Sequence, residues 1–129
     1  LFPLREGETA IPGTPFSIFV EKVSETLKVH NLSTAPYIFL SGKFDIMKEN
    51  LCWRPRREGD RILKGGMHRE VRRLYREAGL PLSVRRMLPL LCDSEGIVWV
   101  PYVGERDGLR EDRSEQEGVL ISLRSKEFN

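Results

Sequence analysis

Arginine side chains dominate the middle of this 129-residue chain, and their chemistry suits the recognition of phosphate. The stretch from Trp53 to Pro89 holds 11 of the 21 lysines and arginines but 4 of the 19 acids, a balance of 11 − 4 = +7, whereas the remainder carries 10 − 15 = −5. A guanidinium stays charged at physiological pH, and its fork of N–H donors matches two phosphate oxygens. Such a local excess is the electrostatic footprint of a surface that meets a polyphosphate. Nucleic acid is therefore the leading candidate partner.

Ten basic residues form the candidate RNA-binding set. They begin directly after the apolar segment 51–53 and continue through a basic segment that reads as a helix. A competing interpretation is that these arginines only solvate a helix face and neutralise nearby acids, as Asp60 could do between Arg57 and Arg61. The set is Arg54, Arg56, Arg57, Arg61, Lys64, Arg69, Arg72, Arg73, Arg76 and Arg85.

Catalytic and metal-binding patterns are weak by comparison. His30 and His68 have no second ligand at metal spacing, and neither a nucleophile-elbow nor a phosphate-loop motif occurs. Cys52 and Cys92 lie forty residues apart in segments that read as strands, so we expect reduced core thiols. An enzymatic alternative would use Asp60 and His68 as a hydrolytic pair. We assign no catalytic residue, no metal site and no cofactor to this chain.

One amphipathic helix is predicted to present most of the arginines. Apolar residues recur at helical spacing over 66–78, and the intervening arginines fall on the opposite side. Gly79 supplies a stop in the left-handed conformation, and Pro81 prevents continuation. A second short helical turn is predicted over 83–87, carrying Arg85. The expected apolar face is Met67, Val71, Leu74, Tyr75 and Ala78, and the expected arginine face is Arg69, Arg72, Arg73 and Arg76.

The rest of the chain reads as short strands separated by turn formers, which is typical of an antiparallel, β-rich arrangement. A strong hairpin signal joins 90–92 to 97–100 through the turn 93–96. The acidic stretch 104–118 has few apolar anchors and is predicted to be a mobile loop. Trp53 and Trp99 lie in strand patterns and are expected to fill the core. Further strands are predicted over 16–20, 26–29, 37–40, 51–53 and 119–123.

Composition indicates a folded domain. Apolar residues make up 40% of the chain and charged residues 31%, interrupted by strand-like apolar runs. No apolar run is long enough to cross a bilayer, and the first residues lack signal-peptide order, so the cytoplasm is the expected location. The chain begins at Leu1 rather than Met, which suggests a fragment of a longer protein.

Four motifs in succession resemble a known family. RPRREGDRI, REVRRLYREAGLP, VRRMLPLL and EGIVWVPYVG occur in the order and with the spacing found in the C-terminal part of bacterial tRNA(Ile)-lysidine synthetase. The resemblance is strong from Leu51 to about Gly104, and the upstream IPG and YIFLSGKFD segments also look similar. The chain departs from the family at Lys64-Gly65-Gly66-Met67, where the glycine-rich turn is shorter, and at Glu70, which replaces a basic residue.

The resemblance implies a fold and a function. The fold would be α+β and β-rich, a small antiparallel or mixed β-sandwich of the type shared with the phenylalanyl-tRNA synthetase β subunit, with one basic helix and a short second turn. The intact enzyme would use ATP and magnesium to join lysine to the anticodon cytidine of an isoleucine tRNA. Its catalytic serine-glycine-glycine pattern is missing here, so this chain would bind the tRNA acceptor stem while an N-terminal catalytic domain of the same polypeptide does the chemistry.

The expected organisation is a β-rich lead-in at 1–50 packed with a tRNA-binding module at 51–129. A further alternative makes the arginine face a docking site for the acidic segment 105–117 of the same or another copy, which leaves a homodimer open.

Overall fold

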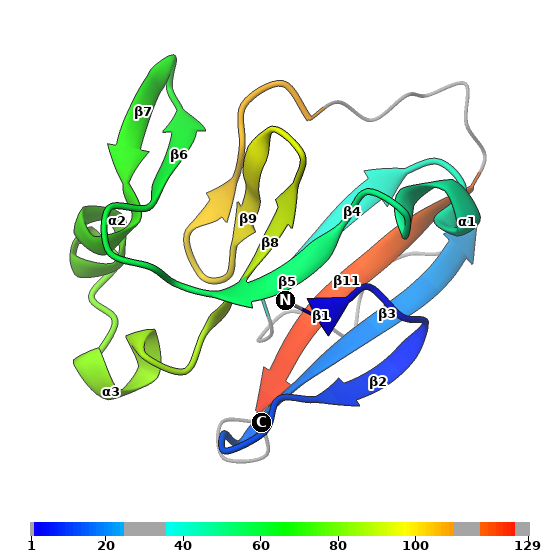
Figure 1. Ribbon diagram of the computed structural model, residues 1–129, viewed down its shortest axis with the longest axis horizontal. Helices are drawn as coiled ribbons and strands as arrows, with labels where there is room; N and C mark the ends of the chain where they lie inside the picture. Colours follow the sequence, from blue (N-terminus) through cyan, green and yellow to red (C-terminus); the bar gives the residue numbers. More distant parts are fainter. Residues whose placement is uncertain (1, 25–35, 110–116, 126–129) are drawn as a thin grey trace. The chain divides into compact units, whose positions relative to one another are not determined.

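The computed structural model describes residues 2–24, 36–109 and 117–125 and has the predicted α+β, β-rich character (Figure 1). Every strand pair in these residues is antiparallel, and the helices are few and short. The elements in chain order are β1 (Phe2–Pro3), β2 (Gly7–Ala10), β3 (Phe16–Ser24), β4 (Tyr37–Ser41), α1 (Phe44–Met47), β5 (Cys52–Pro55), β6 (Arg61–Lys64), β7 (Met67–Glu70), α2 (Val71–Glu77), α3 (Leu82–Arg85), β8 (Pro89–Asp93), β9 (Gly96–Val100), β10 (Gly104–Glu105) and β11 (Glu117–Ser125).

The chain divides into two compact units. The first, here called the arginine unit, comprises Leu1–Pro3 and Leu51–Leu109. The second, the β11 unit, comprises Leu4–Asn50 and Arg110–Asn129. This division differs from the expected segments 1–50 and 51–129, because the last strand pairs with strands from the beginning of the chain. Hydrophobic pattern along the sequence predicts β3, β4 and β11 but does not say which strands will be neighbours.

The β11 unit is built on a four-stranded sheet in the order β2-β3-β11-β4. Strand β11 pairs with β3 along its whole length, from Glu117 opposite Ser24 to Ser125 opposite Phe16. Its apolar residues are almost all buried, since a central strand has neighbours on both edges. The predicted strands at 16–20, 37–40 and 119–123 are confirmed, whereas the one at 26–29 lies outside the described residues.

The arginine unit contains a five-stranded sheet in the order β1-β5-β8-β9-β10. The predicted hairpin is confirmed as β8 and β9. Trp53 and Trp99 are buried, and their rings meet edge to face at 6.0 Å between centroids, so both fill the core as expected. One row of partners crosses the whole sheet, in the order Phe2, Trp53, Leu91, Trp99 and Glu105.

The two cysteines occupy opposite positions on neighbouring strands of this sheet. Cys52 in β5 is the register partner of Cys92 in β8, and both thiols are free. Cys92 is buried, and burial raises its pKa, so the neutral thiol is favoured.

The predicted helix at 66–78 is wrong in its first turn. Residues Met67–Glu70 form strand β7, which pairs with β6 in a two-residue hairpin. Gly65 and Gly66 make the turn with φ of 63° and 78°, which is the backbone that a type I′ hairpin turn requires. Met67 consequently lies at the tip of this hairpin, here called the β6–β7 ribbon, and is 68% exposed instead of facing the core.

The remaining helix, α2, is short but follows the predicted pattern. Val71, Leu74 and Tyr75 are buried, which confirms three of the five apolar positions, whereas Ala78 is exposed. The helix ends in a Schellman motif, because Gly79 has a φ of 73° and the N–H of Leu80 bonds to the carbonyl of Tyr75 at 3.2 Å. The second helical turn is confirmed as α3, one residue earlier than expected.

The expected mobile loop at 104–118 is wrong at its beginning and end. Residues Gly104–Glu105 form β10 and Glu117 opens β11, while 110–116 lie outside the described residues. Among the described residues no helix is long and apolar enough to cross a membrane.

Candidate nucleic-acid interface

Asp60 organises the loop 56–60 that leads from β5 to β6, here called the arginine loop. Its two carboxylate oxygens accept hydrogen bonds from the two terminal nitrogens of Arg54 at 2.9 and 2.8 Å. The backbone N–H of Arg57 donates to the same carboxylate at 2.7 Å. The side chains of Arg54 and Asp60 are only 14% and 10% exposed, so the pair is largely withdrawn from water. This carboxylate therefore holds the loop closed against the end of β5.

The same residue connects the loop to the basic helix. The carbonyl of Asp60 accepts a hydrogen bond from the N–H of Val71 at 2.9 Å, at the first residue of α2. Burial alone would raise the pKa of Asp60, but the hydrogen bonds from Arg54 and the Arg57 N–H hold it below its ordinary value. Asp60 stays ionised at neutral pH and fixes the arginine loop and α2 together.

Three arginines of the candidate set are neutralised within the fold. Arg54 is held by Asp60, Arg61 lies 3.7 Å from Glu70 across the β6–β7 ribbon, and Arg69 donates two hydrogen bonds to Glu77 at 3.0 and 2.8 Å. Arg69 also lies on β7 rather than on the outward face of a helix. Each of these three guanidiniums therefore has a carboxylate partner within the fold.

Lys64 and Arg85 have backbone partners. The ammonium of Lys64 donates to the carbonyl of Glu105 at 3.4 Å, and Nε of Arg85 donates to the carbonyl of Leu80 at 2.6 Å. A carbonyl has no formal charge, so these hydrogen bonds do not neutralise either side chain.

Six arginines of the arginine unit, here called the open arginines, donate no hydrogen bond and form no ion pair through their side chains with any described residue. Five of them are exposed, and Arg56 is half-buried. Arg86 belongs with them although it was left out of the candidate set; its position beside Arg85 was the signal in the sequence. The open arginines are Arg56, Arg57, Arg72, Arg73, Arg76 and Arg86.

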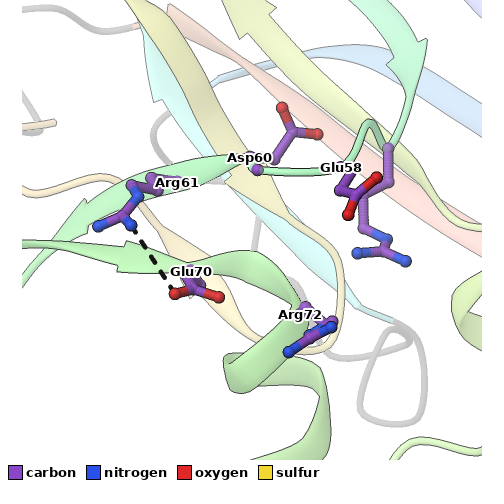
Figure 2. Close-up of a pocket in the computed structure, with 7 residues that line it drawn as sticks. Glu58, Asp60, Arg61, Glu70 and Arg72 are labelled. Carbon is purple, nitrogen blue, oxygen red and sulfur yellow. Dashed lines mark ion pairs between the residues drawn. The ribbon is translucent and has the colours of Figure 1, made fainter.

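A shallow pocket of about 260 Å³ lies among the loop, the ribbon and α2 (Figure 2). Figure 2 shows the ion pair between Arg61 and Glu70 on one side of it and Arg72, at the start of α2, on the other. Three arginines and three carboxylates share its lining, so it offers both donors and acceptors and no large net charge. The lining residues are Arg56, Glu58, Gly59, Asp60, Arg61, Glu70 and Arg72.

A second largely buried ion pair, between Arg106 and Asp93, stabilises the arginine unit. Arg106 donates two hydrogen bonds to Asp93 at 2.9 and 2.8 Å, with side-chain exposures of 14% and 12%. Asp107 then fastens the hairpin, because its carboxylate accepts from the N–H of Gly66 at 2.8 Å and its own N–H donates to the carbonyl of Leu63 at 2.9 Å. The sequence did not predict these contacts of Arg106 and Asp107, because the stretch 104–118 reads as a solvated acidic loop.

In this geometry Asp60 is poorly placed to act as the general base of the hydrolytic alternative. Both oxygens of Asp60 are bonded to Arg54, and the low pKa of this carboxylate disfavours proton uptake. His68 lies exposed on β7. The described residues contain no group of three or more His, Cys, Asp or Glu that could hold a metal ion.

The two buried ion pairs predict how stability responds to acid. The Arg106 guanidinium holds the pKa of Asp93 below its usual range, as Arg54 and Arg57 do for Asp60. Because both pKa values are lowered on folding, their stabilisation is complete above the ordinary carboxyl value of about 3.9 and disappears as pH falls through the lowered values.

We expect the free energy of unfolding to be flat between about pH 8 and pH 5 and to fall steeply below about pH 4. Urea titration followed by tryptophan fluorescence measures this. Asp93→Asn should be less stable at neutral pH and should lose less on acidification. Equal stability at about pH 5 and pH 3 would contradict the prediction.

Comparison with known proteins agrees with this fold and this motif order. The family model described as the TilS substrate C-terminal domain matches residues 51–122, more than half of the chain. The tRNA(Ile)-lysidine synthase of Symbiobacterium thermophilum is 30% identical over 122 residues, covering 93% of this chain and 25% of that protein. The Bacillus cereus enzyme is 28% identical over 127 residues, covering 91% and 26%. The Thermotoga maritima enzyme is 40% identical over 60 residues, covering 46% and 14%.

A solved structure described as a TilS C-terminal domain superposes with a TM-score of 0.75 at 22% identity, covering 97% of this chain and 95% of that one. The fold is thus the same along almost the whole length of both chains. This chain spans about a quarter or less of the curated relatives that it matches. On the family match and the shared fold, it belongs to the family of TilS substrate C-terminal domains.

Proposed function

We propose that this domain binds the acceptor stem of an isoleucine tRNA through the open arginines. The observation that carries the proposal is that these six guanidiniums come from the arginine loop, α2 and the end of α3, all within one compact unit, and that none of them hydrogen-bonds to or forms an ion pair with a described residue. Unpaired arginines on a folded surface favour phosphate, which they bind through paired N–H donors. Arg54, Arg61 and Arg69, by contrast, support the fold.

The mixed pocket suits RNA better than a simple anion. Double-stranded RNA is recognised mostly through its backbone and the 2′-hydroxyls of its shallow minor groove. A 2′-hydroxyl both donates and accepts hydrogen bonds, so the carboxylates and guanidiniums around the pocket can both serve it. The open arginines would hold the phosphates on either side.

In this proposal the chemistry belongs to a catalytic domain elsewhere in the same polypeptide, which uses ATP and magnesium to join lysine to the anticodon cytidine. Binding energy spent on the acceptor stem orients the distant anticodon loop and so lowers the entropic part of the barrier. The domain would act in the cytoplasm as a binding module.

Single alanine substitutions test the phosphate contacts. Arg72→Ala and Arg73→Ala should each weaken binding to an acceptor-stem RNA hairpin roughly 5- to 10-fold and reduce the slope of log K against log salt by about one. Fluorescence anisotropy over a salt series gives both values. Arg5→Ala, an exposed arginine of the β11 unit, is the matched control and should change neither.

Unchanged slopes for both variants would reject phosphate contact by α2. The competing idea of charge-mediated self-association is separated by sedimentation without RNA, because such a complex would dissociate between low and high salt.

A further inference from the structure

Tyr102 occupies a backbone position that tyrosine rarely takes. The N–H of Val103 bonds to the carbonyl of Val100 at 3.0 Å, which closes a tight turn between β9 and β10. Pro101 and Tyr102 are its central residues, and Tyr102 has a φ of 70°. This geometry is that of a type II turn, whose third position favours glycine or asparagine because a positive φ is required there. Among the described residues, Tyr102 alone combines a side chain with a positive φ.

The strain at Tyr102 is not offset by full burial of the ring. The residue is 39% exposed at the apex of the turn, and partial burial raises the pKa of its hydroxyl. A glycine would make the same turn without steric cost. Strained backbone that persists in a packed fold is characteristic of positions with a functional side chain.

The turn leaves the same end of the sheet as the segments that carry three of the open arginines. From the row Trp53, Leu91 and Trp99, β5 continues to Pro55, β8 starts at Pro89 opposite it, and β9 runs on towards Pro101. The three connections therefore leave the same end of the sheet, as Figure 1 shows. Strands β5 and β9 are separated only by β8, so these connections start within about 10 Å of each other.

These connections carry complementary groups. Arg56 and Arg57 follow Pro55, Arg86 precedes Pro89, and Tyr102 follows Pro101. A flat aromatic ring beside guanidiniums is the combination that binds unpaired nucleotides, because the ring stacks on a base while the cations hold its phosphates. Inside a duplex each base is already stacked on both sides, so a ring can reach an open base face only where pairing stops.

We propose that Tyr102 is a stacking platform for the first unpaired base beyond the end of an RNA duplex, next to phosphates held by Arg56, Arg57 and Arg86. The inference rests on the proposed function and extends it from the paired stem to the unpaired nucleotide that follows. The ligand is RNA with a single-stranded extension. The strain in the turn is kept because it presents the ring at this end of the sheet.

The experiment compares two RNAs with the same duplex, one flush-ended and one with a short 3′ extension whose first unpaired base is 2-aminopurine. The chain should bind the extended RNA roughly tenfold more tightly and quench the 2-aminopurine on binding. Tyr102→Gly should abolish the preference and the quenching, yet raise Tm by about 4 °C because glycine relieves the turn. Tyr102→Phe should keep both binding signals, since the ring does the stacking.

The outcomes separate this inference from the proposed function. If the flush duplex binds but Tyr102→Gly keeps the preference and quenching, Tyr102 is not the platform and the proposed function stands. If neither RNA binds, both fail. Arg72→Ala should weaken both RNAs alike, while Tyr37→Ala, an exposed aromatic residue of the β11 unit, should leave both unchanged.

Discussion

Replacing Asp60 with alanine will destabilise the arginine unit by about 3 kcal/mol and will weaken RNA binding as well, although Asp60 itself carries the wrong charge to touch phosphate. The loss of stability arises because Arg54 stays largely buried without a counter-ion, at 14% side-chain exposure. The loss of binding arises because Asp60 also holds the Arg57 N–H and the start of α2. Without it, the loop and the helix lose their common anchor.

Urea unfolding and RNA titration of the same preparations measure both effects. Asp60→Asn keeps the size of the side chain but loses its charge and should fall between the wild type and alanine. A double variant, Arg54→Met with Asp60→Leu, removes the buried charges together and should recover most of the stability, since well-packed apolar residues often replace a buried pair at little cost.

The double variant should not recover full RNA affinity, because leucine cannot accept the hydrogen bond that the Arg57 N–H donates to Asp60. If Asp60→Ala unfolds at the same urea concentration as the wild type, the ion pair is not what holds the loop. If it is less stable but binds RNA normally, the anchoring role is wrong.

The elements with strong local signals were predictable. The hairpin β8–β9 has a four-residue polar turn between apolar runs, and the buried positions of α2 recur at helical spacing. The hairpin at Gly65-Gly66 was missed because β6 and β7 are only four residues each and the arginines nearby also suit a helix. The positive φ of both glycines favours the β6–β7 hairpin over a helix, and hydrophobic periodicity does not report backbone conformation at glycine.

The sorting of the arginines could not be predicted from composition. Arg61 meets Glu70 because the ribbon register places them opposite each other, and Arg69 reaches Glu77 although eight residues separate them. Both pairs depend on the β6–β7 hairpin, whose Gly65-Gly66 turn signal was outweighed by the helical reading of the same segment. Charge clustering thus located the arginine-rich part of the chain, while only tertiary structure divides the cluster into arginines that form ion pairs within the fold and arginines that face solvent.

That division leads to the largest expected loss of binding. Reversing two open arginines in Arg72→Glu/Arg73→Glu should lower RNA affinity by more than about 100-fold, because two phosphate contacts are lost and two repulsive charges are added. Both side chains are exposed on α2, so stability should change by no more than about 0.5 kcal/mol. Anisotropy titration at fixed salt gives the affinity, and thermal unfolding shows that the fold is intact.

A matched pair of reversals in the β11 unit, Arg5→Glu/Lys43→Glu, changes the net charge by the same amount and serves as the control. If binding depended only on overall charge, both double variants would lose affinity equally, and the assignment to the arginine unit would be wrong. If it depends on the open arginines of α2, only the α2 variant should lose affinity. The physical distinction is between a long-range field, which salt screens beyond about 10 Å, and direct contact with phosphate, which depends on particular side chains.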